Sequence, residues 1–462
     1  MHRKSPLGMR ARSRASIVAA LFAISAAASL HAQAFDSATF HRRRAALAKL
    51  ARTGIVVIQS VEHNQTGLTE YLIDDSDNHD FLFLTGVEAP SSTLVLLPQS
   101  TLYPEILFVP EKDVAAAKAR SGVKTVIASD KFVSMLGDAL TNYSIKRFTE
   151  RKRKPVSSEM ARVLSLTPTK PVAFNFPRYF SLSTEVPERV QLANRIKSFV
   201  PSVELRDASP MLDALRIRHD AADIAMIRKV VNIGSLGLVA AMKACRPGML
   251  DTQVDSVALA EFIHQGASRR AYPSLIYVAP FARKVTALSA DEVAKSSEPS
   301  SAVHKMEAGD LVMLDAGAEY QHYASDLSRT VPVSGKFTAE QRRYYDAVLA
   351  AHHAAIAAVK PGATFRQVDD AAVAELHKQN LDQYFTFATS HFIGMDAHDA
   401  GDYDSPMQPG MVFTVEPGII DTEKNIVIHV EDIILVTPTG HENLSKSIPI
   451  EAADIEKLME QK

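Results

Sequence analysis

The chain has 462 residues, of which 46% are hydrophobic, and its 51 basic and 53 acidic side chains give a formal net charge of −2. This length is enough for two domains, because single hydrophobic cores stop growing at roughly 250–300 residues. The balanced charge gives no support to a nucleic-acid partner or an anionic membrane surface, and the single cysteine excludes an intrachain disulfide.

The first 34 residues have the composition of a secretory signal peptide. The basic segment MHRKSPLGMRARSRA precedes the uncharged run SIVAALFAISAAASL, and Ala32-Gln33-Ala34 supplies small residues for cleavage. The run is shorter than the ~20 residues that span a bilayer, which favours cleavage over an anchor. We expect residues 1–34 to be removed, Phe35 to begin the mature chain, and the protein to be periplasmic or secreted. We expect no later segment to be long and apolar enough to cross a bilayer.

Residues 35–204 predict an α/β domain. A helical pattern at 36–51 is followed by short apolar runs that alternate with helical stretches. The predicted strands are GIVVIQ (54–59), FLFLTGV (81–87), TLVLLP (93–98), EILFVP (105–110) and TVIAS (125–129). This alternation is typical of α/β folds.

Residues 205–462 predict an α+β domain. Amphipathic helices are expected at 220–244, 250–266 and 338–359. The expected strands lie at 274–278, 310–317, 323–333, 411–418 and 425–438. Strands that are segregated from long helices indicate an antiparallel sheet covered by helices.

Two of these strand-like runs each contain an aspartate. Asp315 ends LVMLD, and Asp326 lies inside YASDLSRTV. If the runs pair about the polar segment 319–322, the two carboxylates lie nearly opposite on one face of a hairpin. Repulsion between half-buried carboxylates would raise a pKa unless a cation lies between them.

Three further residues interrupt apolar runs downstream: Glu416 in MVFTVEPG, Glu431 in NIVIHVEDIILV and His391 at the start of HFIGMDAHD. Each alone would more simply be a surface residue or a satisfied core residue. Buried glutamates in neighbouring strands call for a common partner, however. Four carboxylates and one imidazole suit a pair of Mn²⁺, Zn²⁺, Co²⁺ or Fe²⁺ ions, held ~3.5–4 Å apart by shared carboxylates.

The local sequence around these residues resembles that of the pita-bread metallopeptidases, in their aminopeptidase P and prolidase branch. The segments that carry the resemblance are LVMLDAGAEY, YASDLSRTVPVSGKFT, SHFIGMDAHD, MQPGMVFTVEPGI and VEDIILVTPTG. YLIDDSDNHDFLFLTGVEAPSSTLVLLP is similar to the N-terminal domain of that branch, which methionine aminopeptidases lack. The resemblance implies a creatinase-like, ribonuclease H-like N-terminal domain, a pita-bread catalytic domain, and hydrolysis of the bond before proline or of X-Pro dipeptides.

The resemblance also assigns metal ligands. It implies that Asp315 binds one metal ion, that His391 and Glu416 hold the second, and that Asp326 and Glu431 bridge the two. We expect two divalent ions, with Mn²⁺ first and Zn²⁺ or Co²⁺ as alternatives.

The resemblance assigns catalytic roles as well. A bridging hydroxide would attack the peptide carbonyl, Glu416 would shuttle its proton, and His398 in MDAHD would stabilise the oxyanion. The expected partners are proline-containing peptides and further copies of the chain, as a homodimer or homotetramer, without nucleic acid and without a membrane after signal cleavage.

Three positions depart from the family pattern. Thr286 stands where a histidine is expected upstream of the first metal aspartate. His304 is the nearest histidine that could replace it, although its place beside Lys305 more simply suggests an exposed turn. Phe387 replaces a histidine four residues before the metal histidine, and His429 replaces an arginine two residues before the bridging glutamate. The five predicted ligands are untouched. The departures leave open a different amide substrate, or a weakly catalytic protein that mainly binds peptides.

Overall fold

The computed structural model describes residues 35–60, 76–141, 155–178, 186–279, 304–385 and 387–461. The chain divides into two units, Met1–Asp36 and Ser37–Lys462, and every helix and strand given below lies in the second. The predicted signal peptide and Thr286 fall outside the described residues.

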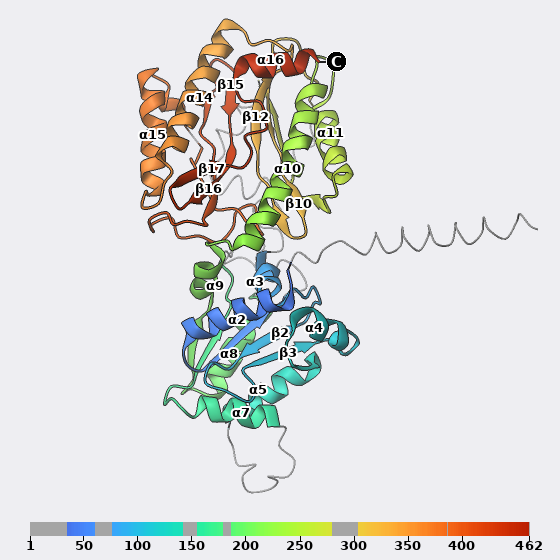
Figure 1. The fold of residues 1–462 in the computed structure, drawn as a ribbon, viewed down its shortest axis with the longest axis vertical. Coiled ribbons are helices and arrows are strands. Elements are labelled where there is room, and N and C mark those ends of the chain that lie inside the picture. The colour runs from blue at the N-terminus through green and yellow to red at the C-terminus, as the bar shows by residue number, and fades with distance from the viewer. Residues whose placement is uncertain are drawn as a thin grey trace, which may run out of the picture. The chain divides into compact units, whose positions relative to one another are not determined.

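One mixed sheet organises the N-terminal part of the larger unit (Figure 1). Its strands, in spatial order, are β4 (Thr125–Ala128), β3 (Glu105–Val109), β2 (Thr93–Leu96), β1 (Ile55–Gln59), β5 (Pro171–Phe174) and β6 (Glu204–Asp207). β2 is antiparallel to β1 and β3, whereas β3–β4, β1–β5 and β5–β6 are parallel pairs. The predicted domain boundary after residue 204 therefore falls at the first residue of β6.

Helices pack on this sheet, as predicted for an α/β domain. They are α2 (Ser37–Ala51), α3 (Ser76–Thr85), α4 (Val114–Ser121), α5 (Phe132–Thr141), α7 (Pro155–Leu164) and α8 (Glu188–Phe199), with short 3₁₀ turns η1 (Glu111–Asp113) and η2 (Ser129–Lys131). Strand residues such as Val57 and Phe108 share one buried cluster with Met160 of α7 and Leu192 of α8. The core of this domain thus lies between the sheet and α5, α7 and α8.

The predicted strand at 81–87 is wrong, because Ser76–Thr85 forms helix α3. The Thr85 hydroxyl donates to the Phe81 carbonyl at 2.7 Å, a bond of helical spacing. Phe81, Phe83 and Leu84 are all buried. A short apolar run without alternation can be a buried strand or a buried helix, so periodicity alone could not identify this segment as a helix.

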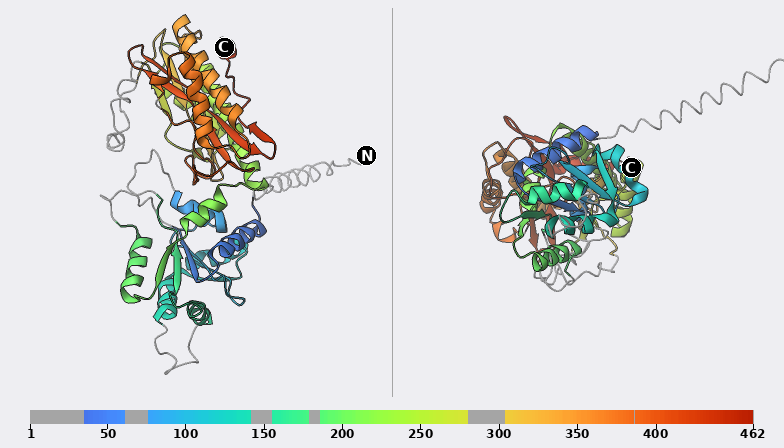
Figure 2. Two further views of the ribbon diagram at one scale, coloured as in Figure 1. Left: turned by 90° about the vertical axis from the view of Figure 1, so that its left-hand side faces the viewer. Right: turned by 90° about the horizontal axis from the view of Figure 1, so that it is seen from below.

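Two helix pairs flank the strands of the C-terminal part (Figures 1 and 2). The helices are α9 (Ser209–Arg216), α10 (Ala221–Ala244), α11 (Asp251–His264), α14 (Ala339–Ala358), α15 (Phe365–Lys378) and α16 (Ala452–Glu460), with the 3₁₀ turn η4 (Asp382–Tyr384). α10 packs on α11, and α14 packs on α15. Asp220 caps the start of α10, because its side chain accepts from the backbone N–H groups of Ala222 and Asp223.

The strands between these pairs join only in antiparallel pairs within the described residues. They are β7 (Arg269–Arg270), β8 (Leu275–Val278), β9 (Leu311–Asp315), β10 (Ala318–Tyr320), β11 (Tyr323–Ala324), β12 (Ser328–Pro332), β13 (Val412–Val415), β14 (Gly418–Asp421), β15 (Ile426–His429), β16 (Asp432–Thr437) and β17 (Gly440–Asn443). They form the groups β11-β10-β7, β12-β9-β8, β13-β16-β17 and β14-β15. The predicted α+β architecture is confirmed.

α10 corrects one expectation, since by length and composition it is apolar enough to cross a membrane. Its side chains Ile227, Val231 and Leu238 are fully buried, and it packs against α11, β10, β11 and β12. These contacts are those of a core helix. Its charged residues Arg228 and Lys229 are exposed, as in an amphipathic helix that covers a core.

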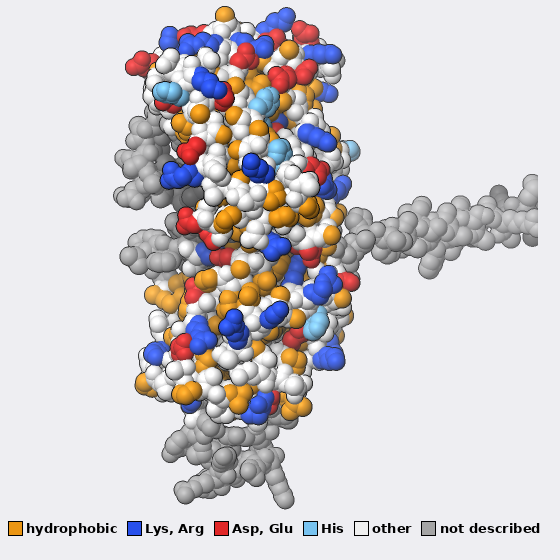
Figure 3. Space-filling model, turned by 60° about the vertical axis from the view of Figure 1, so that its left-hand side comes forward, with side chains coloured by type: hydrophobic (Ala, Val, Ile, Leu, Met, Phe, Trp, Pro, Cys, Tyr) orange, Lys and Arg blue, Asp and Glu red, His pale blue; other side chains and the backbone are white. Residues whose placement is uncertain are grey.

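Basic and acidic side chains are interspersed over the face seen in Figure 3. Charge on that face is therefore not segregated by sign. The concentration of acidic groups described next is a local feature of the interior.

Candidate metal centre

A hairpin brings the two predicted aspartates to one face. β9 pairs with β12 so that Asp315 lies opposite Ser328. The turn is made by Gln321 and His322, whose φ angles of 49° and 65° are left-handed. Asp326 precedes Ser328 by two residues, so it is the diagonal neighbour of Asp315 on the same face. The hairpin forms as predicted, with Asp326 displaced by two residues from direct pairing.

Tyr272 links the two carboxylates. Its hydroxyl lies 2.7 Å from Asp315 Oδ1 and also contacts Asp326 Oδ1. Burial and the neighbouring Asp326 raise the pKa of Asp315 to about 7. Burial and both aspartates raise the pKa of Tyr272, so this hydroxyl keeps its proton and remains a donor. The charge repulsion expected from the sequence is therefore present.

Glu431 is the least satisfied member of the group. It lies between β15 and β16, is 1% exposed, and its two carboxylate oxygens have no hydrogen-bond partner among the described residues. Burial and the nearby Asp326 and Glu416 raise its pKa well above the usual range. A buried carboxylate with no donor costs free energy until a proton or a cation neutralises it.

His391 and Glu416 form a second side of the site. The Nδ1–H of His391 donates to the Phe392 carbonyl at 3.2 Å, which leaves Nε2 facing Glu416 Oε1 at 3.3 Å and Asp326 Oδ2 at 3.4 Å. The Thr414 hydroxyl donates to Glu416 Oε1 at 2.8 Å. Burial lowers the pKa of His391, but Glu416 and Asp326 outweigh this effect and raise it to about 9. Burial raises the pKa of Glu416, but His391 and His429 hold it below the usual range.

His398 lies at the open side of the same cluster. Its ring stacks on His391 with centroids 3.9 Å apart and planes 15° apart. Desolvation beside the site and the cationic His391 lower its pKa. His398 is thereby kept neutral near pH 7, with an N–H that can donate.

The described residues contain three overlapping groups whose ligand atoms lie within 4.8 Å of one another. They are Asp326–His391–His398, Asp315–His429–Glu431 and His391–Glu416–Glu431. All five residues that the sequence suggested as ligands are brought together. His398 and His429 join them.

Family models match both parts of the chain. The model of metallopeptidase family M24 matches residues 225–438, and that of the aminopeptidase P N-terminal domain matches residues 40–146. The chain belongs to metallopeptidase family M24, in its aminopeptidase P branch.

Individual M24 relatives agree with this placement. The chain is 27% identical to the Xaa-Pro aminopeptidase of Escherichia coli over 91% of this chain and 97% of the relative. It is 31% identical to the Xaa-Pro aminopeptidase of Haemophilus influenzae over 57% of this chain and 65% of the relative. The solved structure of proline aminopeptidase P II from Yersinia pestis matches with a TM-score of 0.70 and 25% identity, covering 93% of this chain and all of that one. The predicted creatinase-like and pita-bread domains are confirmed.

M24 membership implies divalent metal ions, and the residues fit them. The unpartnered oxygens of Glu431 and the raised pKa of Asp315 both indicate negative charge that the protein does not neutralise. Oxygen-rich sites with imidazole suit first-row divalent ions. The side chains of this cluster are therefore suitable ligands for the divalent ions of an M24 metal centre.

Two departures from the M24 pattern contact each other. The ring of Phe387 stacks on His429, with centroids 4.5 Å apart and planes 14° apart. His304, the nearest replacement for the missing upstream histidine, instead bonds to Asp251 at the start of α11, with Nδ1 3.0 Å from Oδ2. The altered positions at 387 and 429 thus form one local unit.

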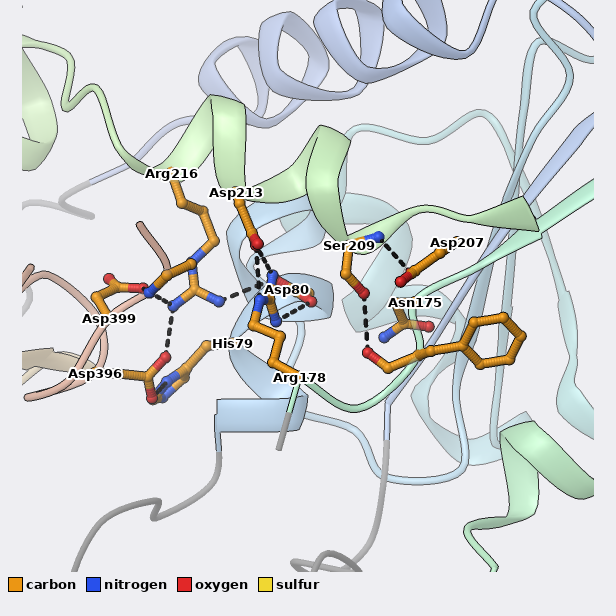
Figure 4. Close-up of polar contacts among 12 residues, drawn as sticks. His79, Asp80, Asn175, Arg178, Asp207, Ser209, Asp213, Arg216, Asp396 and Asp399 are labelled. Carbon is orange, nitrogen blue, oxygen red and sulfur yellow. Dashed lines mark hydrogen bonds and ion pairs between the residues drawn. The ribbon is translucent and has the colours of Figure 1, made fainter. Parts of the chain in front are cut away.

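A buried ion network, drawn in Figure 4, includes Asp396 and Asp399, which stand on either side of His398 in the chain. The Arg216 guanidinium bonds to Asp396 and Asp399 at 2.6 Å each and to Asp80 of α3 at 2.9 Å. Asp399 also accepts from the backbone N–H of Met395 at 2.9 Å. His398 is therefore flanked by two carboxylates that are fixed to one arginine.

Tyr272, Thr414 and Arg216 are contacts that sequence reasoning missed. Thr414 lies within a predicted strand and Tyr272 lies two residues before one. Neither side chain is charged, so neither interrupts its apolar run as the glutamates do. Arg216 lies more than a hundred residues from Asp80 and Asp396 along the chain, so no local pattern signals their pairing.

Proposed function

We propose that this M24 protein is a metal-dependent Xaa-Pro aminopeptidase, which hydrolyses the peptide bond before proline. The observation that carries the proposal is the buried cluster of four carboxylates and His391, in which both oxygens of Glu431 have no partner among the described residues. The relatives named Xaa-Pro aminopeptidase support the substrate class.

The proposed ligands are those predicted from the sequence. Asp315 would hold one divalent ion, His391 and Glu416 the other, and Asp326 and Glu431 would lie between them. Mn²⁺ is the first choice, and Zn²⁺ and Co²⁺ suit the same donors. Bound divalent ions supply Lewis acidity and lower the pKa of water.

Glu416 is proposed as the proton carrier. Thr414 and His391 fix its Oε1, and its lowered pKa keeps it ionised near neutral pH. An ionised carboxylate in a fixed position can accept a proton from the attacking water and pass it to the leaving amine.

His398 is proposed as the donor to the substrate carbonyl. Its ring is held on His391, and its lowered pKa keeps it neutral. A neutral N–H placed beside a carbonyl oxygen meets the negative charge that develops there, without the repulsion that a charged neighbour of His391 would bring.

A second candidate function is favoured by Phe387. The resemblance places a polar histidine at this position in active members, whereas here an aromatic ring covers His429. This change favours a metal-binding protein that acts on another amide, or that binds peptides with weak catalysis. A protein that holds full metal but cleaves no proline peptide would support this candidate.

The test combines metal analysis with a substrate panel. The purified mature protein is expected to contain two divalent ions and to cleave X-Pro dipeptides or X-Pro-Y tripeptides, but not matched X-Ala-Y tripeptides. Asp326→Asn should abolish both metal binding and turnover. Asp346→Asn is the matched control, because Asp346 lies in an exposed pair with Arg342 on α14. Normal turnover by the Asp326 variant would contradict the ligand assignment.

We further propose export and self-association. The signal-like composition of residues 1–34 supports a periplasmic or secreted protein that is cleaved after Ala34 and does not stay in the membrane. N-terminal sequencing of the exported protein should then begin at Phe35. A homodimer or homotetramer is proposed, and light scattering of the purified protein tests it.

A further inference from the structure

His429 has the arrangement of a metal ligand. It ends β15 and is 2% exposed. Its Nε2 lies 2.9 Å from the backbone carbonyl of Glu416, and because a carbonyl only accepts, Nε2 carries the proton. Nδ1 is then the free nitrogen. It is buried, has no hydrogen-bond partner among the described residues, and lies 3.8 Å from Asp315 Oδ2.

The same arrangement recurs at His391. There Nδ1 donates to the Phe392 carbonyl, and Nε2 faces two carboxylates. Metal-binding histidines characteristically donate their other ring N–H to a carbonyl or carboxylate, which fixes the tautomer and the ring orientation. Each histidine therefore presents one ring nitrogen to the same acidic cluster: Nε2 in His391 and Nδ1 in His429.

Glu431 completes the group on the side of His429. A nitrogen of His429 and one oxygen each of Asp315 and Glu431 lie within 4.8 Å of one another. Glu431 and the Nδ1 of His429 are both buried without hydrogen-bond partners in the described part of the chain. A lone pair and a carboxylate that share a buried space repel each other, and one cation between them satisfies both.

Local packing fixes the His429 ring in this position. Phe387 stacks on one face of it. Gly418 lies opposite His429 in the β14–β15 pair, and a Cβ at Gly418 would come within 2.6 Å of the Phe387 ring and 2.9 Å of the His429 ring. Only glycine leaves room for the two rings to stack there, so the orientation of Nδ1 is set by the surrounding chain.

We propose that His429 is an additional metal ligand, which binds through Nδ1 the ion held by Asp315 and Glu431. The inference rests on the proposed function, since it requires metal at these two carboxylates. Each ion of the pair then has one imidazole, instead of a single imidazole for both. A second nitrogen ligand favours Zn²⁺ and Co²⁺ relative to Mn²⁺, because imidazole suits the former and carboxylate-rich sites suit Mn²⁺.

The competing role for His429 is that of a cation. The resemblance places an always-charged arginine at this position, and a protonated imidazole would replace it as a donor to the carboxylates. Arginine at position 429 distinguishes the two roles, because it could act as the cation but could not act as the metal ligand. His429→Arg supplies the charge and the donors but no metal-binding lone pair, whereas His429→Gln supplies neither charge nor imidazole.

The affinity test is isothermal titration of metal-free protein with Mn²⁺ and with Zn²⁺. Both His429→Gln and His429→Arg should weaken binding of one ion by more than about 100-fold, beyond the ~10–100-fold that loss of an outer partner produces. The loss should be larger for Zn²⁺. His441→Gln is the matched control, since Nδ1 of His441 also bonds to a backbone carbonyl, that of Val359, but lies in no metal group of the described residues. Unchanged binding by His429→Arg would overturn the proposal.

A second measurement needs no variant to fold. In the Co²⁺-loaded wild-type protein, proton NMR should show strongly shifted, exchangeable imidazole N–H signals from both His391 and His429, because both protons are held by backbone carbonyls. Fewer than two such signals would overturn the proposal. A wild-type protein that binds no divalent metal would instead contradict the proposed function itself, so the two failures are distinguishable.

Discussion

Arg216 gives the most direct test of the buried ion network in Figure 4. Its side chain is 2% exposed and pairs with Asp80, Asp396 and Asp399 at 2.9, 2.6 and 2.6 Å. Arg216→Met keeps the length of the side chain and removes its charge. We expect it to lower the free energy of unfolding by about 3–5 kcal/mol, the cost of leaving a buried charge without its partner.

The loss should not be three times that value, because two of the three carboxylates keep another cation. Arg178 bonds to both oxygens of Asp80, and His79 Nδ1 lies 2.6 Å from Asp396. Asp399 depends most on Arg216. Burial already raises the pKa of Asp399, so this carboxyl can take up a proton when the arginine is removed, and that uptake limits the cost.

The assay is urea unfolding of the mature protein, together with steady-state kinetics. Because Asp396 and Asp399 flank His398, displacement of their loop should lower kcat by about 10²-fold while metal content stays unchanged. Arg342→Met, in an exposed pair with Asp346, should cost no more than about 1 kcal/mol. Asp399→Asn should restore part of the stability of Arg216→Met. A loss below about 1 kcal/mol with unchanged kcat would refute the positioning role.

Three further outcomes are expected. Burial lowers the pKa of His79, but Asp396 outweighs this effect and raises it. The stability that this pair contributes is therefore complete below the unfolded pKa of about 6.5 and is lost as the pH rises through the folded pKa. Urea unfolding should show a larger cost of His79→Gln at about pH 6 than at about pH 9. Tyr272→Phe, which removes the donor shared by Asp315 and Asp326, should destabilise the chelated protein by about 1.5–3 kcal/mol in the same assay. Chelation of the wild type should lower its unfolding free energy, and free metal at 100 times its Kd should restore about 2.7 kcal/mol.

The architecture was readable from the sequence where a helix cap is present or where proline bounds a short apolar run. α10 begins one residue after Asp220, which caps it, and the strands of 93–98 and 105–110 are found within two residues of their predicted ends. α3 was misread, because an apolar run without alternation has no period to measure. Local signals thus determine elements best where a cap or a turn residue marks the end of the element.

The register of the metal hairpin could not be fixed in the same way. Two-residue hairpin turns are usually recognised in a sequence by Asn-Gly or Asp-Gly, because these residues tolerate a left-handed φ. Here Gln321 and His322 adopt that conformation, and neither residue type signals it. The sequence could place Asp315 and Asp326 on one face, but not decide that Ser328 lies opposite Asp315.

The structure separates two buried acidic clusters that the sequence could not tell apart. Asp80, Asp396 and Asp399 are neutralised by Arg216, Arg178 and His79. The cluster at the proposed metal centre has ion pairs only with histidines in the described part of the chain. Protein cations therefore satisfy the first cluster, whereas the histidines of the second supply too little positive charge for its four carboxylates.

This contrast decides which cluster needs a metal ion. Removing a carboxylate from an unneutralised site relieves repulsion, whereas removing one from a neutralised site breaks a pair. In chelated protein, Asp315→Asn should thus be neutral or stabilising, and Asp399→Asn destabilising. With metal present, Asp315→Asn should become the costly change, because it then removes a ligand. Urea unfolding of both variants with and without metal would show this reversal, and equal effects in both conditions would contradict it.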